Sequence, residues 1–192
     1  MKPLPILVLL LSLLSPILLQ GQTTLFPGDL TIVNINSDGA KNFDLLLLSD
    51  ISAGTVFKLT DDAWMDDNQS FRGSEGILTY TASSDMTAGT VISCPGKDGG
   101  NGFVESGNFN PAGSGDNLIV YQGDESDPFF IFAIGWARGS TVWEYSEISA
   151  SYRSDVPMGL SFDDGTVVRL GTSDNYRLLS GARDPGSRGD LL

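Results

Sequence analysis

The eight residues DLTIVNIN at positions 29–36 decide how this sequence folds. Apolar and polar residues mostly alternate along the stretch, and its apolar members are Leu30, Ile32, Val33 and Ile35. A strand buried on one face gives this pattern, because successive side chains point to opposite faces of a sheet. The stretch therefore predicts a β-strand with one face toward a core.

Two other runs are apolar at every position, LLLL at 45–48 and FFIFAI at 129–134. Each run is short and is bounded by turn-forming residues, which favours a strand over a buried helix. A strand that is apolar on both faces is typical of the middle of a covered sheet. We therefore expect these runs to be central strands.

The remaining sequence continues the same spacing of short apolar runs between Gly, Asp, Asn and Ser. The predicted strands are residues 29–36, 43–49, 55–60, 76–82, 90–94, 117–122, 129–136, 141–145, 166–170 and 176–179. About ten short strands indicate an all-β fold, namely a two-layer β-sandwich of the Ig-like, lamin-tail-like or jelly-roll kind. The glycine-rich connection at 101–116 is predicted to be a mobile or binding loop.

Residues 1–21 have the layout of a secretory signal peptide, with Lys2 first, an apolar run to Leu19 and a polar exit. The alternative is a membrane anchor, which the prolines within the run disfavour. We therefore expect a secreted or cell-surface protein with no membrane span after cleavage. Residues 22–181 are predicted to form one domain, and 182–192 a disordered tail or linker.

The chain has 24 acidic and 11 basic residues, a net charge of −13. Such a surface repels phosphate backbones, so nucleic acid is excluded as a partner and an extracellular protein or glycan is expected. Cys94 is the single cysteine, so the chain forms no internal disulfide and must be stabilised by its core. We expect Cys94 itself to be a small buried strand residue.

The sequence contains no histidine. Mechanisms that use imidazole as base or metal ligand are therefore excluded, including the Ser-His-Asp and Cys-His hydrolases and most zinc enzymes. Neither the GxSxG nor the GxxxxGK motif is present. Carboxylate chemistry remains, and a glycoside hydrolase needs only two suitably placed acids.

The densest polar cluster is TDDAWMDDNQS at 60–70. Its four aspartates offer hard oxygen ligands and predict a Ca²⁺ site at Asp61, Asp62, Asp66 and Asp67. The spacing does not match an EF-hand loop. The alternative is an ordinary acidic loop whose aspartates cap turns and face water while its tryptophan packs on the sandwich.

Four aromatic residues elsewhere offer surface that would stack on sugar rings if it were exposed, or core packing if it were buried. These residues are Tyr121, Trp136, Trp143 and Tyr145.

The segments DLTIVNINSD at 29–38, FDLLLL at 43–48 and DISAGT at 50–55, followed by LTYTA at 78–82, carry a resemblance. They resemble a module of secreted or surface proteins in bacteria such as Bacteroidetes and cyanobacteria, loosely similar to lamin-tail-like β-sandwich domains. The resemblance implies an extracellular domain with no established activity, often an accessory part of a longer polypeptide. It implies no functional residues.

The function predicted from these features is a non-catalytic secreted binding or structural module. Its strands would supply a rigid frame, and the loops at 61–75 and 95–116 would supply the contact surface. The alternatives are a carboxylate-based glycoside hydrolase and a Ca²⁺-stabilised adhesion domain.

Overall fold

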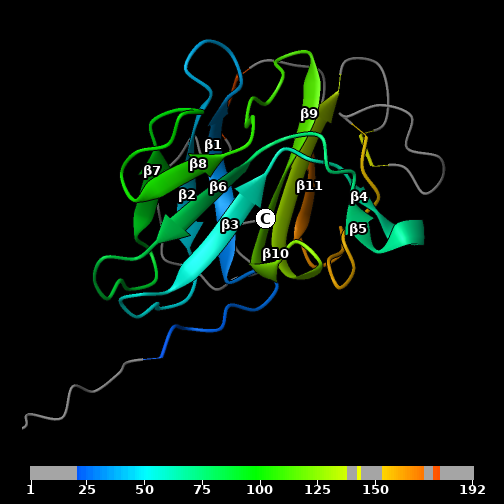
Figure 1. Ribbon diagram of the computed structural model, residues 1–192. Coiled ribbons are helices and arrows are strands. Elements are labelled where there is room, and N and C mark those ends of the chain that lie inside the picture. Colours follow the sequence, from blue (N-terminus) through cyan, green and yellow to red (C-terminus); the bar gives the residue numbers. More distant parts are fainter. Residues whose placement is uncertain (1–20, 138–141, 144–152, 171–174, 178–192) are drawn as a thin grey trace, which may run out of the picture.

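The computed structural model describes residues 21–137, 142–143, 153–170 and 175–177 (Figure 1). These residues form an all-β fold with a four-stranded sheet, a six-stranded sheet and a small hairpin, which confirms the predicted fold class. The predicted leader, apart from Gly21, and the predicted tail at 182–192 lie outside the described residues. So does most of the strand predicted at 141–145.

The smaller sheet is antiparallel and has the order β12-β1-β2-β7. Its strands are β1 (Leu30–Asn36), β2 (Asn42–Leu47), β7 (Val91–Cys94) and β12 (Asn175–Arg177). The first three residues of the apolar run at 45–48 lie in β2, between β1 and β7, with Leu45 and Leu47 fully buried. Its central position in the sheet is therefore as predicted.

The interrupted alternation in β1 has a structural cause. The pairing of β1 with β2 shifts register between Ile32 and Asn34, which marks a β-bulge at Val33. Because a bulge adds one residue to a strand, Ile35 returns to the same face as Ile32 and joins it in the core. The two adjacent apolar residues in the sequence were the signal of this bulge.

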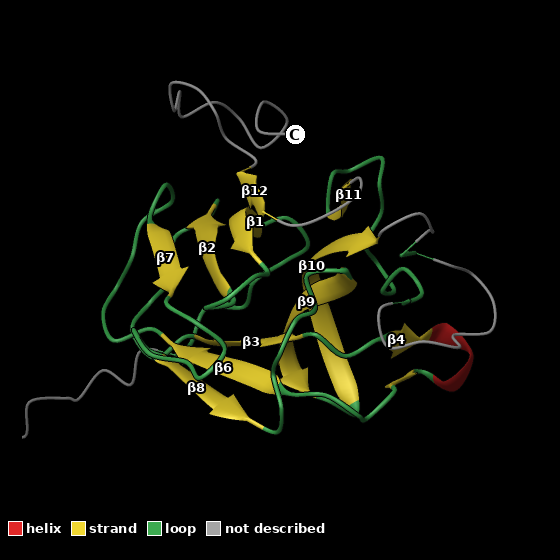
Figure 2. Ribbon diagram, turned by 90° about the horizontal axis from the view of Figure 1, so that it is seen from above, coloured by secondary structure: helices red, strands yellow, loops and turns green. Residues whose placement is uncertain are grey.

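The larger sheet has the order β11-β10-β9-β3-β6-β8 (Figure 2). Its strands are β3 (Val56–Thr60), β6 (Ile77–Thr81), β8 (Phe103–Ser106), β9 (Gly115–Asp124), β10 (Asp127–Ala137) and β11 (Val167–Leu170). β11 is parallel to β10, and the other neighbouring strands are antiparallel. Figure 2 shows the two sheets as two stacked layers.

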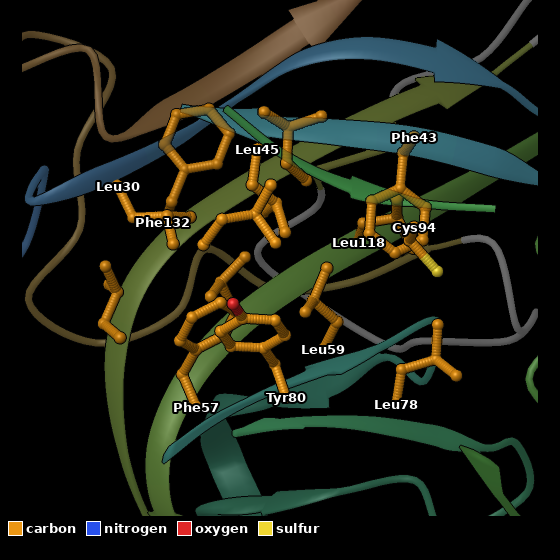
Figure 3. Packing of buried hydrophobic residues seen from close by; sticks show 14 of the residues in the cluster. Leu30, Phe43, Leu45, Phe57, Leu59, Leu78, Tyr80, Cys94, Leu118 and Phe132 are labelled. Atoms are coloured by element: carbon orange, nitrogen blue, oxygen red, sulfur yellow. The ribbon is translucent and has the colours of Figure 1, made fainter. Parts of the chain in front are cut away.

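The main core fills the space between the layers (Figure 3). Leu30 and Leu45 enter it from the small sheet, and Phe57 and Tyr80 enter it from the large one with their rings stacked 4.8 Å apart. Cys94 is buried at the same interface, where its thiol donates a hydrogen bond to the Gly96 carbonyl. Burial raises the pKa of this thiol to about 11, so it is an unreactive core residue, as predicted.

A second apolar cluster covers the opposite face of the large sheet. Along β9, Leu118 and Val120 point into the main core, whereas Ile119 and Tyr121 belong to the second cluster. Because side chains alternate along a strand, the two clusters lie on opposite faces. The 129–134 run in β10 is likewise buried on both faces from residue 130 onward, as its composition predicted, whereas Phe129 is 45% exposed.

The second cluster is covered by irregular segments. They are the hairpin of β4 (Trp64–Met65) and β5 (Ser70–Phe71), with a 3-10 turn η1 (Asp66–Asn68) between its strands, and the stretch 153–166. Trp64 packs edge-on against Phe71 and Phe130 at ring distances of 5.3 and 4.8 Å. The described ranges contain no helix with the length and hydropathy needed to cross a membrane.

The connection at 101–116, predicted to be a mobile or binding loop, includes a strand and a buried residue in the structure. It contains β8, which pairs with β6, and its residue Phe109 is buried in the main core. The loop also passes so close to Gly76 that a Cβ there would lie 2.0 Å from the Phe109 amide nitrogen. Both observations show that the part of this connection between β8 and β9 is packed against the sandwich.

Candidate functional site

The four aspartates of the 60–70 cluster occupy two different environments. Asp61 and Asp62 follow the end of β3 and are buried, with 1% of Asp61 exposed. Asp66 and Asp67 lie in η1 and are exposed. The structure therefore separates the cluster into an inner pair and an outer pair.

Asp62 closes the base of the β4–β5 hairpin. Its Oδ1 accepts a hydrogen bond from the amide of Ala63 at 3.0 Å, and its Oδ2 accepts from Gly73 and Ser74. These amides belong to both ends of the hairpin, so a single carboxylate joins them. Asp62 is therefore the turn-capping residue that the alternative interpretation of the cluster described, although it is buried.

Asp61 fixes the connection that enters β9. Its Oδ2 accepts a hydrogen bond from the amide of Asn110 at 2.7 Å, and its Oδ1 accepts one from Gly76 at 3.3 Å. Asp116 of β9 accepts hydrogen bonds from the amides of Ala112 and Asn117 at 2.6 and 2.9 Å. Two buried carboxylates thus hold the backbone between residues 110 and 117.

Both of these carboxylates are electrostatically strained. Burial raises the pKa of Asp61 to about 6, against the backbone hydrogen bonds that lower it, and neighbouring Asp62 raises it further. Burial also raises the pKa of Asp116 well above its usual range, with additional repulsion from Glu75 and Asp61. Both side chains are buried and accept hydrogen bonds from backbone amides. Their raised pKa values therefore result from burial and do not indicate an accessible pair of catalytic acids.

The aspartate cluster has no metal-binding arrangement in the part of the chain that is described. There, no group of three or more Cys, Asp or Glu side chains is placed so that it could hold a metal ion. Asp61 and Asp62 direct their oxygens at backbone amides, whereas Asp66 and Asp67 are on the outside. The Ca²⁺ site stays a prediction that this geometry does not support.

An open groove lies between η1 and the loop at 156–163. Asp66 and Gln69 line one wall, the loop forms the other, and the groove has a volume of about 480 Å³. Figure 2 places η1 at the side of the large sheet away from β7 and β8. The groove is therefore formed by one predicted contact loop, 61–75, and by a segment that the sequence analysis had not selected.

Hydrogen bonds from residues 154 and 155 join the two walls. Ser154 Oγ accepts a hydrogen bond from the Trp64 amide at 2.9 Å, and the Asp155 amide donates to the Trp64 carbonyl at 2.9 Å. Asp155 Oδ2 accepts from the Asp66 amide at 2.8 Å. Leu160 anchors the far wall in the second apolar cluster. The walls are thus held by the same packing that covers the large sheet.

The groove is both apolar and acidic. Met158 is 61% exposed and Phe162 40% exposed, and both line it. Asp66 and Asp163 add carboxylates to the lining, and neither forms a salt bridge within the described ranges. The guanidinium of Arg169 lies over the Phe162 ring, 5.3 Å from its centre. An apolar surface beside unneutralised carboxylates suits a ligand that is partly apolar and partly cationic.

The aromatic residues considered for sugar stacking are not at this site. Tyr121, Trp136 and Trp143 are buried, and Tyr145 lies outside the described residues. The indole nitrogens of Trp136 and Trp143 donate to the carbonyls of Ala112 and Val168, as buried tryptophans usually do. These three residues are therefore part of the packing.

The groove residues missed by the sequence analysis lie in the segment VPMGLSFDDG at 156–165. Its apolar residues Val156, Met158, Leu160 and Phe162 fall on every second position, as they would in a strand, but Pro157 and Gly159 between them are turn formers and argue against a strand. This alternation was the available signal.

Comparisons with known protein families, with curated proteins and with solved structures found no match to this chain.

Proposed function

We propose that this protein is a non-catalytic secreted or cell-surface binding module. The β-sandwich provides a rigid frame, and the groove between η1 and the 156–163 loop provides the contact surface. The protein recognises an extracellular partner through this surface and does not transform it.

One observation carries the proposal: two exposed large apolar side chains lie together on one wall of the groove. The described residues include five exposed large hydrophobic side chains, namely Phe26, Val104, Phe129, Met158 and Phe162. Two of them lie within five positions on one wall of the groove. Solvent-exposed apolar side chains grouped in a concave site are typical of contact surfaces.

The burial of the two acids whose pKa is strongly raised also favours binding over hydrolysis. The strained carboxylates of Asp61 and Asp116 accept backbone hydrogen bonds in the interior, where a substrate would not reach them. A glycoside hydrolase needs two acids facing each other across an accessible cleft.

The extracellular location rests on the sequence. The signal-like segment at 1–21 and the net charge of −13 both suit export into an aqueous, partner-rich environment. Expression of the full chain with its leader, followed by mass spectrometry of the secreted and surface fractions, tests this part. We expect a product that lacks the leader, and retention of the intact chain in the cytosol would contradict it.

The binding function is tested with peptide and glycan arrays, using the wild-type protein and a Met158→Ser/Phe162→Ser variant. We expect specific binding by the wild-type protein that the double substitution weakens, because both side chains are exposed at the groove. A panel of polysaccharides is assayed in parallel for hydrolysis. Reproducible turnover that is lost on replacing an acidic residue would overturn the proposal.

A further inference from the structure

We infer that the groove binds a basic peptide segment of a partner protein, with an apolar side chain seated between Met158 and Phe162 and a cationic side chain at the carboxylates of Asp66 and Asp163. This inference rests on the proposed binding function and specifies the chemistry of its partner. It follows from the shape, the apolar wall and the charge of the groove.

The shape of the groove favours a peptide. Its volume of about 480 Å³ is sufficient for a few side chains, and it opens broadly to solvent. Small-molecule sites usually enclose most of their ligand, whereas a shallow open groove suits a chain that continues beyond both ends. The exposed fractions of Met158 and Phe162 leave apolar area for such a chain to cover.

The charge of the groove favours a basic segment. Asp66 and Asp163 line it, and Asp67 and Asp164 are their neighbours in sequence. In the described structure, none of these four forms a salt bridge. Because the whole chain is also strongly acidic, long-range attraction and local contacts would favour the same cationic partner.

The negative charges beside the groove already act on the nearby carboxyl group of Asp155. Burial raises the pKa of the Asp155 carboxyl, and the nearby charges of Asp66 and Asp67 raise it further. Asp155 connects to the groove through the Asp66 amide, which donates to its Oδ2. A cationic side chain bound beside Asp66 would reduce this repulsion, so binding relieves an existing electrostatic cost.

Arg169 offers an internal precedent for the recognition of arginine. Its guanidinium lies over the Phe162 ring at 5.3 Å, which is within the usual range of cation–π contacts. Phe162 remains 40% exposed despite this contact. The ring can therefore accept apolar contacts from a partner while it keeps its contact with Arg169.

The test uses three synthetic peptides of equal length and the full chain after leader removal. The first contains arginine and leucine, the second replaces each arginine with glutamate, and the third replaces each leucine with serine. Binding is followed by amide chemical shifts of the isotope-labelled protein, at low and at high salt. We expect only the first peptide to bind well, with shifts at residues 66–69 and 156–163 and weaker binding at high salt.

Substitutions then assign the two halves of the contact. Met158→Ser/Phe162→Ser should weaken binding about tenfold, and Asp66→Asn/Asp163→Asn about threefold. The matched controls are Val104→Ser and Glu105→Gln on β8, at the opposite edge of the large sheet. Val104 is 69% exposed, so its replacement also removes exposed apolar surface, and neither control should alter binding.

Equal binding of the glutamate peptide, or equal loss in the β8 controls, would overturn the inference. So would the absence of peptide binding by a wild-type protein that binds a glycan through the groove, although the proposed binding function would then stand. Hydrolysis of an array substrate would instead remove the proposed function itself. Folding of each variant is checked by its amide spectrum before binding is compared.

Discussion

Two pairs of aspartates stand four residues apart on the same connection and have opposite roles. Asp61 and Asp62 accept hydrogen bonds from backbone amides inside the fold, whereas Asp66 and Asp67 face solvent beside the groove. The pairs have the same chemistry and nearly the same sequence context. The difference shows that an acidic cluster is not a site in itself, because the surrounding backbone decides what each carboxylate binds.

The same contrast applies to the segments that these pairs adjoin. The connection held by Asp61 is anchored in the main core by Phe109, whereas the loop facing Asp66 presents Phe162 to solvent. One segment packs into the sandwich and the other leaves apolar side chains exposed. Four experiments test whether the two regions differ in this way.

The largest expected effect comes from the two phenylalanines. Phe109→Ala should lower the free energy of unfolding by about 3–5 kcal/mol, because a fully buried ring leaves a cavity. Phe162→Ala should cost only about 1 kcal/mol, since Phe162 is already 40% exposed and part of its packing is the contact with Arg169. Urea unfolding measures both. Similar losses would show that the two segments do not differ in their contribution to stability.

The next effect comes from the aspartates themselves. Asp61→Ala should destabilise the fold by about 2–3 kcal/mol, because it leaves the amides of Gly76 and Asn110 without their acceptor. Asp67→Ala should change stability by less than about 0.5 kcal/mol, as expected for an exposed residue. A small effect at Asp61 would mean that water replaces the carboxylate, and the inner pair would not be structural.

The raised pKa values of the buried Asp61 and Asp116 predict that the stability of the fold depends on pH. In the unfolded chain Asp61 loses its proton near its ordinary pKa of 3.8, whereas in the fold it keeps the proton up to about pH 6. The folded state therefore binds more protons in this window, so stability should fall by about 2 kcal/mol as the pH rises from 4 to 7. The raised pKa of Asp116 acts in the same direction.

Thermal unfolding over this pH range measures the slope, and Asp61→Asn should reduce it because the amide does not titrate. Asp67→Asn is the matched control and should leave the slope unchanged. Stability that increases from pH 4 to 7 in the wild-type protein would contradict the raised pKa values of Asp61 and Asp116.

The smallest effect is expected for calcium. Because Asp61 and Asp62 already accept backbone hydrogen bonds, adding Ca²⁺ or a chelator should shift the melting temperature by less than about 1 °C. Differential scanning calorimetry in both conditions is the measurement. A clear increase with Ca²⁺ that Asp66→Asn abolishes would revive the predicted metal site and weaken the contrast between the two pairs.

Much of the frame could be predicted from local patterns. The runs at 45–48 and 129–134 identified central strands, because apolar side chains on both faces require cover on both faces. The strand β8 was missed, since Phe103, Val104, Glu105 and Ser106 form a short edge segment without a strong alternation. Local patterns are weakest for such edges, where only one neighbour stabilises the strand.

The candidate site was largely beyond local patterns. The sequence identified the acidic connection at 61–75 but not the 156–163 loop, which lies about ninety positions away and reaches it through Ser154 and Asp155. No residue in either segment predicts the other, because the hydrogen bonds that join them depend on how the second apolar cluster packs.

The all-β class, the position of most strands, the burial of Cys94 and the exclusion of imidazole chemistry follow from the amino-acid sequence. These properties depend on residue type and on short-range periodicity, which can be read from neighbouring residues. The three-dimensional packing was needed to show which aspartates are buried, which loop is anchored and where an apolar groove opens. Those properties depend on which distant backbone amides and side chains meet, and this is set by packing rather than by neighbours in sequence.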